Sequence, residues 1–387
     1  MIFAEPTLSQ EDRKVLEILE GQRRRLRIET QHNPRCWHGA LRRSTFARAI
    51  QGSNAIEGYN ATMDEAMAAV EDEPPLDERT ETWLAIQGYR KAMSCIMQAA
   101  ADPYFEFSKQ FLKSLHFMMT DFDLSAYPGT WRTGAVQVVN HATSEVVYDA
   151  PYSDLVDPLV NELVEYLDRE SHQSAVVAAA MAHLNLTMIH PLKDGNGRMA
   201  RALQTLVLAR EGVVHPLFSS IEEWLGRNTQ DYYNVLAEVG KGAWNPANSA
   251  MPWVRFCLKA HYQQANTLIR RHDEYESLFN SIESIIRRER LNERMTIPLF
   301  NAAVGIRVTN SRYQKETEES SYVAGRDLKA LTDLEILTPH GEKRGRYYTA
   351  GRELVEVRAR ARRDKTVLDP YQLPEVSVDP GPRLPGI

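Results

Sequence analysis

The spacing of apolar and polar positions along the chain predicts a mainly helical protein. Apolar residues recur at helical intervals over 9–30, 40–57, 78–100 and 105–121. A charged stretch with Pro74 and Pro75 breaks the pattern after the second of these segments. Residues 174–189 are apolar on nearly every side, which is typical of a buried helix, and an amphipathic run follows at 198–211.

One segment has the pattern of a β-hairpin. Residues 135–151 follow Pro128-Gly129 and alternate β-branched residues on both sides of a polar turn at Asn140–Ser144. Two interpretations stay open for this hairpin. An exposed edge could align an extended segment of a target protein by strand pairing, or the hairpin could simply cover the helical bundle.

The C-terminal third has a different character. Residues 250–290 form a long, charged helical pattern that resembles a connector more than a core element. A helical stretch ending at 322–337 runs into a glycine-containing segment at 338–348, and this order predicts a winged helix-turn-helix. The residues beyond it contain several prolines and few large apolar side chains, so we expect a tail whose end is disordered.

These patterns define a mainly α fold class in several parts. At 387 residues, 43% of them hydrophobic, the chain has enough apolar material for more than one core. We predict an N-terminal helical region at 1–75, a helical core with the hairpin at 76–245, a helical connector at 246–290, a winged-helix-like domain at 291–350 and a tail at 351–387.

Composition narrows the cellular setting. The formal net charge of −6 argues against a general affinity for nucleic acid. Cys36, Cys95 and Cys257 are far apart and form no Cys-x-x-Cys pair, which favours a reducing compartment over a disulfide framework. No apolar stretch has the length of a membrane span, and the N-terminus lacks a signal-like apolar segment. We therefore expect a cytoplasmic protein without a membrane partner.

The strongest chemical motif is the connection His190-Pro-Leu-Lys-Asp-Gly-Asn-Gly-Arg-Met-Ala-Arg201. His190 comes at the end of the predicted buried helix, where Pro191 prevents its continuation. Gly195-Asn196-Gly197 supplies the permissive backbone that turns several N–H groups toward one point at the start of the next helix. An anion is expected at that helix N-terminus, because N–H groups and the helix dipole both favour negative charge there.

Charged residues around this turn fit a polyphosphate. Arg198 and Arg201 are three apart in the first turns of the helix, so each can reach a different phosphate. Asp194 precedes the turn, where a carboxylate beside phosphates is suited to hold Mg²⁺. His190 remains as a general base.

Other interpretations of the motif fail on spacing. A calcium loop is excluded because Arg198 and Thr205 stand at the fifth and twelfth positions, where acidic ligands are needed. The chain has neither a P-loop nor a Gly-x-Gly-x-x-Gly motif. His183 lies seven residues before His190 without a third metal ligand nearby, so we interpret it as a core histidine.

The stretch resembles the signature of the Fic (Fic/DOC) family, His-Pro-Phe-x-Asp/Glu-Gly-Asn-Gly-Arg-x-x-Arg, with Leu192 in place of the Phe. The resemblance covers roughly 40–240 and implies a Fic-type helical bundle with the hairpin as a flap. It implies a protein adenylyltransferase, in which His190 deprotonates a target hydroxyl that attacks the α-phosphate of ATP and expels pyrophosphate. The ATP-binding residues that it implies are Leu192, Lys193, Asp194, Gly195, Asn196, Gly197, Arg198 and Arg201, with Asp194 also holding Mg²⁺.

Two further segments resemble parts of the same family. Ser53-Asn-Ala-Ile-Glu57-Gly58 resembles the inhibitory motif Ser/Thr-x-x-x-Glu-Gly/Asn of the class with an N-terminal inhibitory helix. Ser53 and Glu57 share a helix face and Gly58 can end the helix, so Glu57 could pair with Arg201 and remove it from the γ-phosphate site. The segment with Asn228, Tyr232 and Tyr233 resembles the region near the nucleotide base, and at most one of the adjacent tyrosines can face adenine.

The C-terminal module could bind DNA or protein. The candidate phosphate contacts are Arg326, Lys329, Lys343, Arg344 and Arg346. Glu316, Glu318 and Glu319 place negative charge just before the predicted recognition helix, which favours a protein-contact role over DNA binding.

The sequence thus favours an autoinhibited enzyme that transfers AMP from ATP to a Ser, Thr or Tyr hydroxyl of a target protein. The target is either another protein or the chain itself, and a homo-oligomer is left open. Two alternatives also remain open: removal of AMP by the same fold, and a DNA-binding regulator whose Fic-like module senses nucleotide. Intact His190 and Asp194 favour the enzyme over the regulator.

Overall fold

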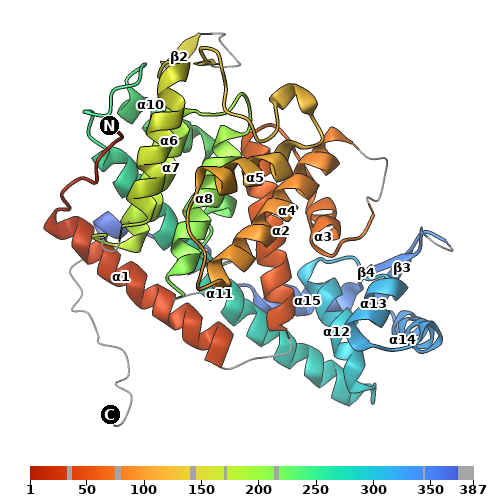
Figure 1. Cartoon of the computed structure of the whole chain (residues 1–387). Coiled ribbons are helices and arrows are strands. Elements are labelled where there is room, and N and C mark those ends of the chain that lie inside the picture. The colour runs from red at the N-terminus through yellow and green to blue at the C-terminus, as the bar shows by residue number, and fades with distance from the viewer. Residues whose placement is uncertain are drawn as a thin grey trace.

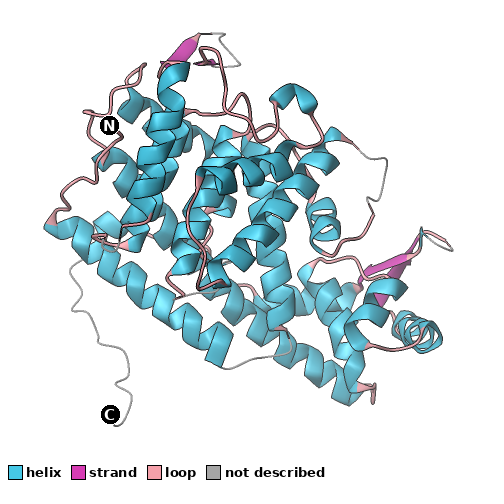
Figure 2. Ribbon diagram, viewed as in Figure 1, coloured by secondary structure: helices cyan, strands magenta, loops and turns pink. Residues whose placement is uncertain are grey.

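The computed structural model describes residues 1–32, 37–74, 80–139, 145–169, 172–212, 218–342 and 345–373. Within these ranges the chain is mainly helical, as predicted, with two small antiparallel sheets of two strands each (Figure 2). The hairpin β1–β2 and the C-terminal elements lie at opposite sides of the molecule (Figure 1). None of the helices in the described ranges combines the length and apolar composition needed to cross a bilayer.

The N-terminal half contains the helices that surround the site. Its elements are α1 (Gln10–Arg27), η1 (Ile28–His32), α2 (His38–Ile56), α3 (Met63–Val70), α4 (Glu81–Ala101), α5 (Lys109–Thr120), η2 (Leu124–Ala126), β1 (Gln137–Val139), β2 (Val146–Asp149), η3 (Ser153–Leu155), α6 (Val156–Leu167), α7 (Ala175–Ile189) and α8 (Asn196–Arg210). The helices α1, α2, α4, α5, α7 and α8 agree with the segments predicted from periodicity, whereas α3 and the short helices had no clear pattern.

The C-terminal half continues the bundle and adds a smaller module. Its elements are α9 (Glu222–Arg227), α10 (Thr229–Gly240), α11 (Met251–Arg288), η5 (Glu293–Met295), α12 (Thr296–Val304), α13 (Asn310–Thr317), α14 (Ser321–Asp333), β3 (Leu337–His340), β4 (Tyr347–Ala350), α15 (Arg352–Ala361) and η7 (Pro370–Gln372).

Helix α7 lies in the centre of the bundle, as its apolar sequence predicts. Nearly all of its side chains are buried, and small residues such as Ala178 and Ala182 let neighbouring helices approach closely. It packs against α8, α6 and α11. His190 follows its last turn, so the site is attached to a helix that is packed on nearly every side.

Residues 250–290, expected to resemble a connector more than a core element, form α11, which also contributes to the core. Helix α11 buries a continuous stripe that includes Trp253, Cys257 and Leu258, and it packs against α1, α7, α10, α12 and α15. The Trp253 indole donates to the Ala180 carbonyl of α7 at 2.7 Å. Many exposed charges on the opposite face mask this stripe in the sequence, because a long amphipathic helix and a solvated connector have similar composition.

The C-terminal module consists of α12–α14 followed by the hairpin β3–β4, with Leu337 paired to Ala350 and His340 to Tyr347. Residues from 351 onward are predicted to form a tail, but Arg352–Ala361 form α15, which packs against α11 and α12. Farther on, the Tyr371 hydroxyl donates to the Asp12 carboxylate of α1 at 3.1 Å. The predicted tail is therefore folded onto the molecule as far as residue 373. Lys343, Arg344 and the tail from 374 lie outside the described residues.

The hairpin β1–β2 forms where the alternating pattern predicts it. Gln137 pairs with Asp149 and Val138 with Tyr148, and the predicted turn Asn140–Ser144 lies outside the described residues. The buried Tyr148 donates its hydroxyl hydrogen to the Met188 carbonyl at 2.8 Å. This bond ties the hairpin to the end of α7, two residues from His190.

Candidate active site

The loop between α7 and α8 has the geometry of a phosphate-binding turn. His190 adopts a left-handed conformation, with φ of 49°, and caps the C-terminus of α7. Gly195, with φ of 77°, precedes α8, as the sequence predicts for this position. The Asn196 side chain accepts from the Leu192 N–H at 3.0 Å and donates to the Leu192 carbonyl at 2.9 Å. The free N–H groups at the start of α8 are therefore held in a closed loop.

Leu192 is fully buried and anchors this loop, although the family signature has a larger Phe there. Its side chain is part of the main hydrophobic core. Lys193 points away from the core, and its Nζ lies 4.7 Å from the centroid of the Tyr127 ring. Leu192 therefore supports the loop from the core, whereas the Lys193 side chain is exposed at its surface.

The His190 imidazole is arranged as a proton acceptor. Its Nδ1 lies 3.2 Å from the Thr187 carbonyl, which can only accept, so Nδ1 carries the proton and Nε2 is the free acceptor. Burial lowers the pKa of His190 below its usual value, and the nearby charge of Arg132 acts in the same direction. Both effects favour the neutral ring that a general base requires.

Arg132 holds the backbone on which His190 is placed. Its Nε donates to the His190 carbonyl at 2.7 Å, and its Nη2 donates to the Pro151 carbonyl at 2.6 Å. The Arg132 backbone N–H donates to the Pro191 carbonyl at 2.9 Å. Arg132 lies just before the predicted hairpin, yet no local pattern indicates that this arginine is buried and turned toward the loop.

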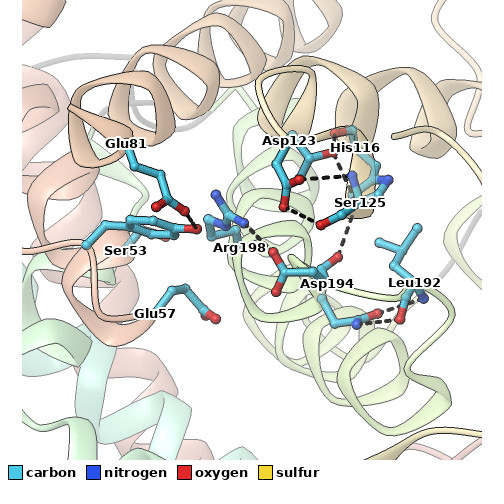
Figure 3. A network of polar contacts seen from close by, with 12 residues as sticks. Ser53, Glu57, Glu81, His116, Asp123, Ser125, Leu192, Asp194 and Arg198 are labelled. Atoms are coloured by element: carbon cyan, nitrogen blue, oxygen red, sulfur yellow. Dashed lines mark hydrogen bonds and ion pairs between the residues drawn. The ribbon is translucent and has the colours of Figure 1, made fainter. Parts of the chain in front are cut away.

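His116 supports the other end of the loop (Figure 3). The Gly129 N–H donates to its Nδ1 at 2.9 Å, so the proton is on Nε2, which donates to the Asp194 carbonyl at 3.1 Å. Burial lowers the pKa of His116 to about 4, and the ring is therefore neutral near pH 7. This histidine, on α5, also has no recognisable signal in the sequence.

Asp194 and Arg198 form an i,i+4 ion pair at the mouth of the loop, with the Arg198 Nη2 3.0 Å from the Asp194 Oδ2 (Figure 3). The Asp194 side chain is 53% exposed, which leaves it accessible to a hydrated cation. Arg198 is almost fully buried, and its Nε and Nη1 have no hydrogen-bond partner among the described residues. A buried guanidinium with unsatisfied donors fits an anionic group bound at this position.

Arg201 is engaged by the end of α2. Its Nη2 lies 2.6 Å from the Glu57 Oε1, and its Nε donates to the Ser53 hydroxyl at 2.8 Å. The predicted ion pair between Glu57 and Arg201 is therefore present. A Cβ at Gly197 would collide with the Glu57 carboxylate, so this carboxylate lies directly against the first turn of α8.

The charge state of Glu57 follows from its position. Burial by itself would raise the pKa of Glu57, but the guanidinium charges of Arg201 and Arg198 outweigh it and the pKa is lowered. Glu57 is therefore ionised near pH 7.

The α2 helix ends next to Glu57 in a Schellman motif, because the N–H groups of Gly58 and Tyr59 donate to the carbonyls of Ala55 and Asn54. Gly58 has φ of 88°, as predicted for a helix stop.

The adjacent tyrosines of α10 point in different directions. Tyr232 is only 1% exposed, and its hydroxyl lies 3.0 Å from the His183 Nε2 in the core. Tyr233 is 45% exposed and donates to the Ile56 carbonyl at 3.0 Å. Asn228 donates to the Trp224 carbonyl at 2.8 Å. Only Tyr233 retains ring surface for a ligand, and His183 is the core histidine that the sequence predicts.

A second buried group lies behind α2. Tyr89 of α4 donates to the Glu222 carboxylate, and burial raises the pKa of Glu222. Next to it, α2 and α9 cross at Gly52 and Gly226, where an added Cβ on either residue would collide with the opposing backbone. This close crossing fixes the position of α2, and so of Glu57, over the site.

Comparison with known proteins finds a similarity to one family around the site. Residues 106–208 match the model described as Fic/DOC family, and the loop from His190 to Arg201 lies inside that range. Over these residues the chain is therefore similar to the Fic/DOC family. The helical bundle with its small hairpin also matches solved structures of this class, including a Fic family protein from Desulfovibrio desulfuricans with a TM-score of 0.58.

Several curated relatives are named for an enzymatic activity. A protein adenylyltransferase Fic of Nematostella vectensis is 25% identical over 266 residues, which are 66% of this chain and 55% of that protein. A protein adenylyltransferase Fic of Drosophila sechellia is 27% identical over 256 residues, 63% of this chain and 46% of that protein. A probable protein adenylyltransferase of Aquifex aeolicus is 27% identical over 121 residues, 30% of this chain and 35% of that protein. The chain thus spans about a third to a half of the length of these relatives.

Similarity to solved structures is limited in sequence and extensive in fold. The Desulfovibrio protein is 19% identical, with 90% of this chain and 98% of that chain covered. Fic-1 from C. elegans is 23% identical with a TM-score of 0.53, and the match covers 67% of this chain and 72% of that chain. These likenesses establish the fold and nothing finer.

Proposed function

We propose that this protein is an autoinhibited protein adenylyltransferase, which transfers AMP from ATP to a Ser, Thr or Tyr hydroxyl of a target protein. The observation that carries the proposal is the pairing of a neutral His190, with a free Nε2, and the unsatisfied buried guanidinium of Arg198 at the N-terminus of α8. A base beside a built anion site suits transfer at phosphorus. Curated relatives named protein adenylyltransferases support this reaction.

The reaction follows from these positions. The His190 Nε2 accepts the proton of the target hydroxyl, whose oxygen attacks the α-phosphorus of ATP. A bond from oxygen to the α-phosphorus forms, the bond to the bridging oxygen of the β-phosphate breaks, and pyrophosphate leaves. The N–H groups at the start of α8 and the guanidinium of Arg198 hold the phosphate oxygens, so the chain contributes position and charge stabilisation.

The residues present also fit Mg²⁺. Asp194 offers a half-exposed carboxylate next to the anion site, and the described residues engage only its Oδ2. Mg²⁺ is usually held by one or two carboxylates together with phosphate oxygens and water. Bound there, the ion would neutralise charge on the phosphates of ATP.

Inhibition is assigned to Glu57. In the structure its carboxylate occupies Arg201 and lies against Gly197, the position expected for the outer phosphates. ATP that entered with Glu57 in place would lack Arg201 as a ligand, and its phosphates would bind in a pose unsuited to in-line attack. Release of the end of α2 would return Arg201 to ATP.

The exposure and pairing of side chains suggest the contacts with adenine, with the target segment and with a partner of the C-terminal module. Tyr233, and not the buried Tyr232, is proposed to pack near the adenine. The hairpin β1–β2 exposes Val139 and Val146 and is proposed to align an extended target segment. In the C-terminal module, Lys329 is paired with Asp333 at 2.6 Å and Arg326 lies 3.4 Å from Asp327, which disfavours DNA as its partner.

Labelling with α-³²P ATP and Mg²⁺ tests the proposal. We expect weak self-labelling of the natural protein, at least tenfold stronger labelling of Glu57→Gly, and none once His190→Ala is added to it. Glu57→Gln is the matched control, since it keeps the shape of the side chain without its charge, and intermediate labelling is expected. Labelling of Glu57→Gly by γ-labelled but not α-labelled ATP would overturn the assignment of AMP transfer.

A further inference from the structure

A cavity of about 200 Å³ on the side of the bundle is lined mainly by cations. Its lining comes from α2, α9, α11 and α15, together with residues just after α15 and the end of α12. The basic residues of this wall, here called the cation cluster, are Arg48, Arg227, Arg270, Arg271, Arg358, Arg362 and Lys365. None of them belongs to the loop between α7 and α8.

Carboxylates satisfy only part of the cation cluster. Glu223 pairs with Arg271 at 2.8 Å and with Arg227 at 2.5 Å. Glu274, the one carboxylate in the described lining, pairs with Arg270 at 2.9 Å. Two carboxylates therefore serve three of the seven cations.

Four cations of the cluster have no such partner. The described residues make no hydrogen bond or ion pair with the side chains of Arg48, Arg358, Arg362 or Lys365, and the Nε of Arg48 is buried without a partner. Burial and the charge of Arg271 lower the pKa of Arg48, and burial and the charge of Arg362 lower that of Arg358. The charges of Glu223 and Glu274 act in the opposite direction on Arg48 and Arg358, respectively, and do not outweigh these effects. The packing of helices that are distant in sequence brings these like charges together. Their mutual repulsion destabilises this arrangement, and a bound anion would offset that repulsion.

We propose that the cation cluster binds a compact oligophosphate such as pyrophosphate or triphosphate. Guanidinium groups recognise phosphate oxygens through paired hydrogen bonds, and several must converge to hold a di- or triphosphate. The cavity volume lies below the roughly 300–1,000 Å³ of pockets for drug-sized ligands, which suits a small, highly charged ligand. The bound anion would connect α2, which carries Glu57, to α15.

Isothermal titration calorimetry with pyrophosphate tests this site. Because the loop at Arg198 is a second place for this anion, the natural protein is expected to show two binding events. The variant Arg358→Gln with Arg362→Gln should lose one of them, with affinity at least tenfold weaker, and keep the other. Arg198→Gln should show the reverse pattern, and inorganic phosphate should bind the cluster at least tenfold more weakly than pyrophosphate.

The matched control is Arg360→Gln, which removes an exposed arginine from the same helix that does not line the cavity. It should bind pyrophosphate as the natural protein does. Equal weakening by Arg360→Gln, or an unchanged isotherm in the double variant, would overturn the proposal.

Thermal melting provides a second readout that is independent of AMP transfer. Without anion the double variant should melt at the same temperature as the natural protein or higher, because it removes repulsion within the cluster. Pyrophosphate should raise the melting temperature of the natural protein more than that of the double variant. The opposite outcome would show that these arginines are structural. In that case the double variant would melt at a lower temperature than the natural protein without anion, and pyrophosphate would raise both melting temperatures equally.

Discussion

At the scale of single residues, His190 depends on contacts made by its backbone. Its ring is oriented by Thr187 one turn earlier, while its carbonyl and that of Asp194 are held by Arg132 and His116. The side chains that carry the chemistry are thus fixed by neighbours that do not reach the reacting atoms. Such support determines whether a base lies within reach of its proton.

The lowered pKa of His190 predicts a pH profile. In Glu57→Gly, the rate of AMP transfer should be flat above about pH 6.5 and fall about tenfold per pH unit below the pKa of the ring. The sign follows because the base must be neutral, and burial keeps the ring neutral to lower pH. Removal of Glu57, whose charge raises the pKa of His190, shifts the midpoint further down. Single-turnover labelling across this range, with ATP binding measured in parallel, would contradict the prediction if the midpoint lay above 6.5.

Arg132 offers a second prediction at this scale. Arg132→Ala leaves the carbonyls of His190 and Pro151 without their donor, which should destabilise the fold by about 1–3 kcal/mol and abolish labelling in the Glu57→Gly background. Arg132→Lys should restore part of the stability but little of the activity, because an ammonium cannot serve several carbonyls in fixed directions. Chemical denaturation and labelling together measure the two effects. Full activity in Arg132→Ala would remove the positioning role.

At the scale of elements, the end of α2 is controlled by its crossing with α9. Gly52 and Gly226 let the two backbones touch, and a Cβ at Gly226 would lie 2.7 Å from the Gly52 Cα. The sequence predicts α2 and its stop at Gly58 correctly. It does not indicate the crossing, because a glycine within a helix looks the same whether it faces solvent or another backbone.

Gly52→Ala should therefore move α2 away from α9. We expect a loss of about 1–3 kcal/mol in stability and an increase in self-labelling, since the contact of Glu57 with Arg201 depends on the position of α2. Gly21→Ala is the matched control, because nothing lies within 4 Å of a Cβ at that helical position. The control should be neutral or slightly stabilising. Unchanged labelling of Gly52→Ala, measured at the same protein concentration, would show that α2 is held by other contacts.

At the scale of the whole molecule, α11 joins the helical bundle around the site to the C-terminal module. Its first half packs on α7 and α10, and its second half on α12 and α15. Ion pairs also connect the module to the region around α3, with Arg43 at 2.7 Å from Glu71 and 2.6 Å from Glu316, and Arg312 at 2.6 Å from Glu73.

We expect the two parts to unfold together. Calorimetry should show one transition for the natural protein, because the buried core of the helical bundle continues into that of the C-terminal module. Arg312→Ala should lower the melting temperature, since it leaves Glu73 without its partner, whereas Arg352→Ala, which breaks an exposed pair with Glu356, should not. Two separate transitions in the natural protein would contradict this coupling.

The sequence by itself determined the helical segments and the loop motif, and the resemblance of two motifs to a known family predicted the pairing of Glu57 with Arg201. Helical periodicity is a local property, and the motif lies within twelve neighbouring residues. Only the tertiary structure decided that Arg132 and His116 hold the loop, that α11 has a buried face, and that Arg48 and Arg358 line the same cavity. These side chains are distant in sequence, and which helix faces meet depends on how the complete set of helices packs.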